Sequence, residues 1–241
     1  MTDHTVHAYD DELRELAQKI AEMGGLAEQQ VAESVTALSE RNASLAQDVI
    51  ATDQRIDKLQ YEVEDSATLM IARRQPMALD LRDIMGAIHI ANDLERVGDL
   101  AKNTAKRVFA IEGNFAAQHL VAGLEHIAEL SLGQLKNALD SYAARDLAGA
   151  RSVWERDDEI DAVYTSLFRE LLTYMMEDPR NITFCTHLLF CGKNLERIGD
   201  HATNIAETVL YLISGARVTE ERPKKDTSPM TSVEYAGVRQ Q

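Results

Sequence analysis

A fifteen-residue segment of this sequence occurs twice, with its two copies about a hundred residues apart. The first copy, ANDLERVGDLAKNTA, covers residues 91–105, and the second, GKNLERIGDHATNIA, covers residues 192–206. Eight of the fifteen positions are identical, where about one identity is expected by chance. Self-similarity at a fixed offset indicates a duplicated structural unit, so we expect the chain to fold as two similar halves.

The repeat extends upstream of this segment. An acidic motif that begins at Asp53 recurs at Asp157, an offset of 104 residues. We therefore predict one unit in residues 1–113 and a second in residues 114–214. The remaining residues, 215–241, are rich in Thr, Ser, Lys and Glu and lack a sustained apolar period, which is typical of a flexible tail.

Proline placement and the apolar period both predict helices. Before the tail, proline occurs only at the repeat-equivalent positions Pro76 and Pro179, so helix-favouring segments run almost without interruption. From Phe184 to Leu212, apolar residues recur at alternating steps of four and three, the spacing of a helix face packed in a bundle. The sequence therefore predicts an all-α fold of two tandem, homologous three-helix bundles. Its six long helices are expected at residues 9–41, 43–73, 78–112, 116–144, 146–176 and 181–214.

The net charge of the chain limits the partners that it can bind, and its cysteine content indicates the cellular compartment in which it works. The chain has 40 acidic and 25 basic residues, a formal net charge of -15 and a pI near 4.9, so it should repel nucleic acid and anionic membranes. Cys185 and Cys191 lie too far apart along one helix to form a disulfide, which favours a reducing compartment. With no apolar run of membrane-spanning length and a polar, acidic N-terminus, we expect a cytoplasmic protein, peripheral to membranes through partners only.

Pairs of acidic residues four positions apart stand at equivalent places in the two units. They are Asp53/Asp57, Glu95/Asp99, Asp157/Asp161 and Glu196/Asp200. On a helix this spacing places both carboxylates on one face, with Cβ atoms about 5–6 Å apart, which suits a shared metal ion. A chain this acidic contains about six or seven such pairs by chance, so the duplication alone gives these pairs weight.

The surroundings of the acidic pairs favour metal sites. Asp53 and Asp157 interrupt otherwise apolar stripes, where a carboxylate needs a partner. One turn beyond the acids of the third helices, Asn103 and Asn204 offer amide oxygens as possible additional ligands. Oxygen ligands of this kind suit Mg, Mn, Ca or Fe, and His201 beside the second set leaves Zn open. The sequence therefore slightly favours sites for divalent or trivalent metal ions of unidentified type.

An alternative interpretation needs no metal. Arg96 and Arg197 each precede an aspartate by three residues, a spacing at which an ion pair stabilises a solvated helix by about 0.2–0.5 kcal/mol. For a single acidic pair this interpretation is the more common one. The protein would then be a metal-free helical scaffold.

The motifs LERVGD and LERIGD, with ARRQP before the first and YMMEDPR before the second, resemble the PhoU family. The resemblance covers about residues 8–214 and leaves the tail outside it. It implies a cytoplasmic regulator, not an enzyme, that represses the phosphate-starvation response when phosphate is plentiful. It also implies that metal clusters bind to the acidic motifs, which correspond here to the eight carboxylates of the four pairs.

The resemblance also implies partners. Members of the family act as adaptors between a phosphate ABC transporter, through its ATPase subunit, and a sensor histidine kinase, and they often form homodimers. The acidic surface is compatible with docking on basic patches of such partners. No glycine-rich phosphate loop occurs in the sequence, so it identifies no site for phosphate itself.

A further alternative is an enzyme, a di-iron carboxylate oxidase built on a helical bundle. That chemistry uses a Glu-x-x-His pair on two helices. The third residue after Glu95 is Gly98, and the third after Glu196 is Gly199, so neither acidic helix carries the imidazole. The sequence therefore disfavours the oxidase, and the two glycines instead predict a close approach between helices.

Overall fold

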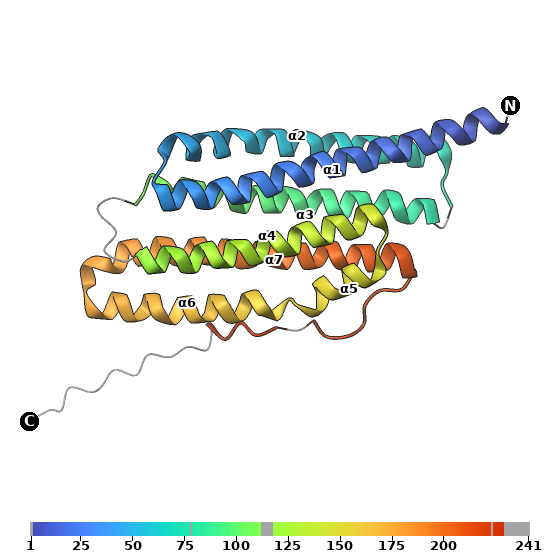
Figure 1. Cartoon of the computed structure of the whole chain (residues 1–241). Helices are drawn as coiled ribbons and strands as arrows, with labels where there is room; N and C mark the ends of the chain where they lie inside the picture. The colour runs from blue at the N-terminus through green and yellow to red at the C-terminus, as the bar shows by residue number, and fades with distance from the viewer. Residues whose placement is uncertain (1, 78, 112–117, 223, 229–241) are drawn as a thin grey trace, which may run out of the picture.

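The computed structural model describes residues 2–77, 79–111, 118–222 and 224–228, and all regular structure in these residues is helical (Figure 1). The first bundle consists of α1 (Thr2–Glu40), α2 (Ala43–Arg74) and α3 (Leu79–Val108). The second consists of α4 (Gln118–Ala144), α5 (Leu147–Glu155), α6 (Asp158–Glu177), the short 3-10 helix η1 (Pro179–Asn181) and α7 (Ile182–Ser214). The prediction of an all-α fold with two tandem helical bundles is confirmed.

The turn between the first two helices is built in the same way in each bundle. Arg41 and Arg145 both adopt a left-handed backbone conformation, with φ of 55° and 51°. Directly after them, Asn42 and Asp146 cap the next helix, because each side chain accepts a hydrogen bond of 3.0 Å from a backbone N–H in the first turn. The two turns share the offset of the acidic motifs, so the duplication extends to the local backbone.

The helix predicted over residues 146–176 is instead divided into α5 and α6. Asp158, Glu159 and Asp161 lie in the first turn of α6. Neighbouring carboxylates repel one another inside a helix but are stabilised at a helix N-terminus, so a new helix start is favourable here. The equivalent segment of α2 has Gln and Arg in place of two of these acids, and that helix is continuous.

The two bundles share one hydrophobic core. Between them, α3 packs along α7 and α1 packs along α4 (Figure 1). The apolar face predicted for α7 from Phe184 onward is buried at every expected position from Leu188 to Leu212, while Phe184 itself is half-buried. The equivalent positions of α3, from Ala87 to Val108, are also buried. Trp154 of α5 is also buried, and its indole Nε1 donates a 2.9 Å hydrogen bond to Glu207 of α7.

The described part of the predicted tail runs back along the second bundle (Figure 1). Gly215 ends α7 in a left-handed conformation with φ of 75°, which reverses the chain. We call residues 216–222 and 224–228 the tail segment. The rest of the predicted tail, residues 223 and 229–241, lies outside the described residues.

The structure shows the state of the two cysteines and the apolar character of the helices. Cys185 and Cys191 are both buried and both free, as their spacing predicts. Among the described residues, no helix is long and apolar enough to cross a membrane.

Candidate functional site

The first acidic face lies where α2 meets α3 and contains all four predicted acids of the first bundle. Asp53 is buried, and Lys102 donates hydrogen bonds to its carboxylate at 2.5 Å and to Asp99 at 2.6 Å. Burial raises the pKa of Asp53 against the opposing effect of Lys102, and the charges of Asp57 and Asp99 add to the rise. The pKa of Glu95 is also raised, mainly by burial and further by these carboxylates. The two predicted pairs therefore form one electrostatic unit, held together by a lysine that the sequence analysis missed.

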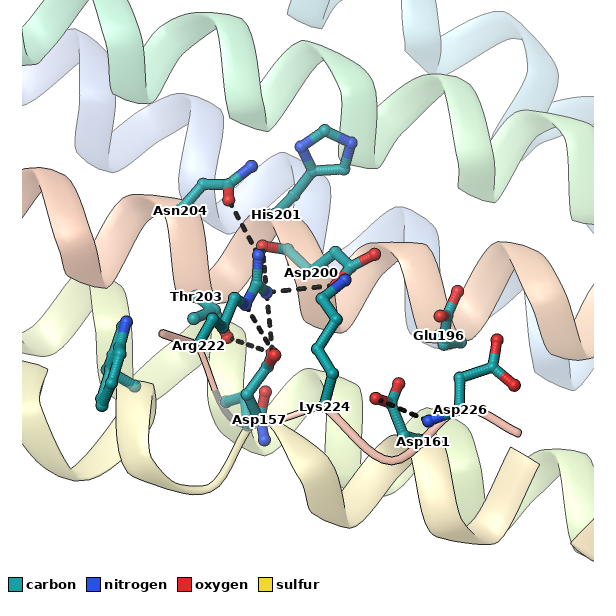
Figure 2. Close-up of polar contacts among 12 residues, drawn as sticks. Asp157, Asp161, Glu196, Asp200, His201, Thr203, Asn204, Arg222, Lys224 and Asp226 are labelled. Carbon is teal, nitrogen blue, oxygen red and sulfur yellow. Dashed lines mark hydrogen bonds and ion pairs between the residues drawn. The ribbon is translucent and has the colours of Figure 1, made fainter. Parts of the chain in front are cut away.

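The second acidic face lies between α6 and α7 (Figure 2). Asp157, Asp161 and Glu196 are buried, and Thr203 donates a 2.8 Å hydrogen bond to Asp157. One oxygen of Glu196 accepts a 2.8 Å hydrogen bond from Lys193, but its buried Oε2 has no hydrogen-bond partner among the described residues. Burial raises the pKa of Glu196 despite the hydrogen bond from Lys193, and burial also raises the pKa of Asp161. This face, too, collects its predicted acids in one place.

On the second face, Lys193 of α7 pairs with Glu196, whereas the cation on Asp157 and Asp200 comes from the tail segment. Arg222 donates from Nε and Nη2 to the two oxygens of Asp157, at 2.6 and 2.7 Å, and pairs with Asp200 at 3.1 Å (Figure 2). Burial alone would lower the pKa of the Arg222 guanidinium, but the hydrogen bonds and charges of these carboxylates outweigh it and raise that pKa. On each acidic face, therefore, one basic side chain pairs with two of the four carboxylates.

The two predicted asparagine ligands differ in position. Asn204 adjoins the second face, because its Oδ1 accepts a 3.2 Å hydrogen bond from Arg222 and its Nδ2 donates to Asp93 of α3 at 3.2 Å. His201 points away from the second face and contacts the same Asp93 at 2.8 Å (Figure 2). Asn103, by contrast, is exposed on α3. Asn204 and His201 thus connect the two bundles, which the local sequence pattern could not predict.

Of the two ion pairs expected within a helix, Arg96 with Asp99 and Arg197 with Asp200, the described residues form only the first. Arg96 pairs with Asp99 at 3.6 Å, and its side chain is 62% exposed, so the pair adds little stability. Asp200, in contrast, pairs with basic residues of the tail segment rather than with Arg197. The predicted ion pair within one helix is therefore confirmed in the first bundle. In the second bundle, Asp200 instead pairs with residues far away in the sequence.

A buried glutamine approaches each face, and the sequence analysis missed both. Gln30 of α1 and Gln134 of α4 share the offset of the acidic motifs, and their amide nitrogens donate to backbone carbonyls at 3.1 and 2.9 Å. Their Oε1 atoms are buried and have no hydrogen-bond partner among the described residues. A Cβ added at Gly98 would lie 3.0 Å from Gln30 Oε1 and 3.4 Å from an Asp53 oxygen, so the predicted close approach at this glycine is confirmed.

Whether a metal ion fits the two acidic faces depends on which atoms could coordinate it. Within residues 2–77, 79–111, 118–222 and 224–228, no three His, Cys, Asp or Glu side chains are grouped to hold a metal ion. Lys102 and Arg222 instead lie between the carboxylates. The carboxylate and amide oxygens, several of them unpartnered, are nevertheless the hard donors that divalent cations prefer. A metal ion therefore fits either face in donor type once the basic side chain has moved away.

The substitution Glu196→Gln is expected to stabilise the protein near neutral pH. Burial raises the pKa of folded Glu196 above its ordinary value of 4.5, against the effect of Lys193, so the folded state retains the proton more strongly than the unfolded state. The stability that this group contributes therefore falls as the pH rises from 4.5 through the raised pKa. The advantage of the variant, measured by urea unfolding, should shrink as the pH falls toward 4.5 and vanish below it.

The substitution Asp178→Asn is a control for which we expect the opposite change in stability. Hydrogen bonds from Arg180 lower the pKa of Asp178 below its ordinary value of 3.8, so its ionised form stabilises the folded state. This variant should lose stability near neutral pH, and the loss should disappear as the pH falls through the lowered pKa. A Glu196→Gln variant that is less stable than wild type near neutral pH would contradict the effect assigned to burial.

Comparison with known proteins places both acidic faces within one type of domain. The family model described as "PhoU domain" matches residues 20–108 and 124–209, one range in each bundle. The chain is 62% identical over 231 residues to a protein of Rhizobium meliloti (strain 1021) named "Phosphate-specific transport system accessory protein PhoU homolog". That match covers 95% of this chain and 98% of the relative.

Solved structures show the same similarity. The crystal structure of PhoU from Pseudomonas aeruginosa has a TM-score of 0.82 and 38% identity, and the match covers 86% of this chain and 100% of that one. The phosphate transport system regulatory protein PhoU from Streptococcus pneumoniae has a TM-score of 0.81 and 29% identity, with coverages of 88% and 100%. The similarity therefore extends over both bundles.

Proposed function

Since the chain belongs to the PhoU family, we propose that it is a negative regulator of the phosphate-starvation response. Its relatives are named as accessory proteins of the phosphate-specific transport system, which supports a role in the regulation of phosphate transport. In the proposed role it is a cytoplasmic adaptor that links the ATPase subunit of a phosphate ABC transporter to a sensor histidine kinase. We propose that it acts as a homodimer. The match over nearly the full length of both chains is the observation that carries this proposal.

The proposed role requires binding and not catalysis. The family is one of regulatory accessory proteins, which supports a non-enzymatic function. The di-iron oxidase alternative gains no support from the glycine positions. A Cβ added at Gly199 would lie 2.5 Å from Ile160, so a histidine at this position would collide with the core.

We further propose that the two acidic faces bind metal ions such as Fe, Mn, Mg or Zn. Their ligands would be the carboxylates of the four predicted pairs, with Asn204 as an additional oxygen donor at the second face. The raised pKa values of Asp53, Glu95, Asp161 and Glu196 support this proposal, because a divalent ion would relieve the cost of their charges. In this proposal the metal ion replaces Lys102 or Arg222 as the neutralising charge.

A metal-free adaptor is the second candidate. It is favoured by the ion pairs, since Lys102 pairs with Asp53 and Asp99 on the first face, and Arg222 pairs with Asp157 and Asp200 on the second, without any metal. Metal content by mass spectrometry, on protein purified without an affinity tag or chelator, separates the two candidates. Stoichiometric metal in wild type that is lost in the Glu95→Ala/Asp99→Ala/Glu196→Ala/Asp200→Ala variant would support metal binding, and metal-free protein in both cases would support the second candidate.

Deletion of the gene tests the regulatory role. In phosphate-rich medium, the deletion strain should express a phosphate-starvation reporter that wild type represses, and expression of this chain from a plasmid should restore repression. Normal repression in the deletion strain would refute the proposed function. Restoration by the quadruple acidic variant would show that regulation does not require the acidic faces.

A further inference from the structure

The two acidic faces differ in the source of their cation. Lys102 reaches Asp53 and Asp99 from within α3, whereas the repeat-equivalent Thr203 of α7 supplies only a hydroxyl group, to Asp157. On the second face Lys193 of α7 pairs only with Glu196, and the cation on Asp157 comes from the tail segment. The tail segment has no helical hydrogen bonds to hold it in place along most of its length. A residue of such a segment can leave the face without unfolding a helix.

Arg222 anchors the tail segment. It forms two hydrogen bonds to the Asp157 carboxylate and a third, of 3.0 Å, to the backbone carbonyl of Asp200 (Figure 2). The Arg222 side chain is 18% exposed and that of Asp157 is 4% exposed, so the pair is largely removed from water. Bidentate arginine and carboxylate pairs are strong and geometrically specific, and lysine cannot reproduce them. This part of the face is therefore built for arginine.

The face also binds the peptide backbone. The N–H groups of Lys225 and Asp226 both donate to Asp161 Oδ2, at 2.9 and 3.2 Å, and the Lys225 ammonium pairs with Asp158 at 2.5 Å. Backbone N–H groups occur in every peptide, so these contacts do not depend on the identity of the side chain. The face thus has the chemistry to hold an extended basic segment, with an arginine three residues before a lysine.

The tail segment leaves part of the face unused. Glu196 is 4% exposed, and its Oε2 has no hydrogen-bond partner among the described residues although it lies beside Asp226 (Figure 2). A buried carboxylate oxygen without a donor is costly. A peptide with one more donor at this position would bind the face more completely than the tail segment does.

We propose that the second acidic face is a docking site for an extended, arginine-containing basic peptide of a partner protein, and that the tail segment occupies this site in cis. The partner peptide displaces the tail segment, places its arginine on Asp157 and donates backbone N–H groups to Asp161. The proposal goes beyond the regulatory role and does not depend on it, because the chemistry of the face defines the occupant. It concerns the second face without a metal ion, since a metal ion on the same carboxylates would exclude the peptide arginine from Asp157. A tethered occupant has an effective concentration of about millimolar, so the tail segment weakens binding of free peptides.

The test uses full-length protein and a fluorescein-labelled synthetic peptide of residues 216–228. Arg222→Ala in the protein removes the contacts of the tail segment with Asp157 and Asp200 and so weakens its hold on the face. The affinity for the peptide, measured by fluorescence anisotropy, should rise at least about tenfold over wild type. A peptide with alanine in place of the arginine that corresponds to Arg222 should bind this variant at least about tenfold more weakly, because the Asp157 contact is lost.

The matched protein control is Arg217→Ala. The Arg217 guanidinium lies over the Tyr211 ring, 5.6 Å from its centroid, and the substitution leaves Arg222 in place, so peptide affinity should stay at the wild-type value. Equal peptide affinity for wild type and the Arg222→Ala variant would overturn the proposal. Equal binding of the two peptides to that variant would also overturn it, and this comparison involves no change in the folding of the protein.

Discussion

The substitution Lys102→Met is expected to lower the free energy of unfolding by about 3 kcal/mol, because removal of one partner leaves a buried charge unpaired. Lys102 lies 2.5 Å from Asp53, whose side chain is 5% exposed, and 2.6 Å from Asp99. Methionine keeps the length and apolar stem of lysine but cannot donate a hydrogen bond or supply charge. Urea unfolding of the wild type and the variant, monitored by circular dichroism, measures the loss.

Two further variants identify the cause of this loss. Lys58 pairs with Glu62 at 3.6 Å but is 78% exposed, so Lys58→Met should cost less than about 1 kcal/mol. The double variant Asp53→Asn/Lys102→Met removes the buried charge together with its partner and should recover much of the lost stability. Equal losses in Lys102→Met and Lys58→Met would contradict the assigned role of Lys102. If the first face binds divalent cations, Mn²⁺ should stabilise the Lys102→Met variant more than wild type.

Leu195→Ala should destabilise the protein by about 2–5 kcal/mol through the cavity that it leaves. Leu195 has no exposed surface and lies on the α7 face that packs in the shared core. Its backbone carbonyl also accepts a 2.9 Å hydrogen bond from Ser131 of α4, so the surrounding backbone has little freedom to collapse into the cavity. The midpoint and slope of urea unfolding give the size of the effect.

Leu69→Ala provides the comparison for this core substitution. Leu69 is 50% exposed, so the same leucine-to-alanine substitution removes much less buried area. It should lower the free energy of unfolding by less than about 1 kcal/mol. Similar losses for both variants would show that the α7 face does not have the packing described here.

The fold was predictable because its determinants are local and occur twice. The spacing of apolar residues on α7 identifies the buried face from Leu188 to Leu212, and the repeat transfers that result to α3. The break before α6 was missed because apolar periodicity does not register the repulsion among Asp158, Glu159 and Asp161. A count of consecutive acids would have signalled it.

The candidate site was predictable in its acids but not in their partners. Lys102 had a usable signal, since it follows Asp99 by three residues and its repeat equivalent is the uncharged Thr203. That difference predicts from the sequence that the cation on Asp157 must come from elsewhere in the chain. The identity of that cation, Arg222, depends on how the chain folds back after α7, and no local pattern specifies such a long-range contact.

The single tryptophan gives this protein a built-in optical probe of one bundle. Trp154 lies in the second bundle, with the Arg151 guanidinium 4.6 Å from the centre of its ring, and Arg151 also pairs with Glu220 of the tail segment. Intrinsic indole emission therefore senses the second bundle and the seating of the tail, while the first bundle contains tyrosines but no tryptophan. Because circular dichroism reports on helices of both bundles, a difference between the two signals during unfolding would reveal whether the duplicated halves still melt as one cooperative unit.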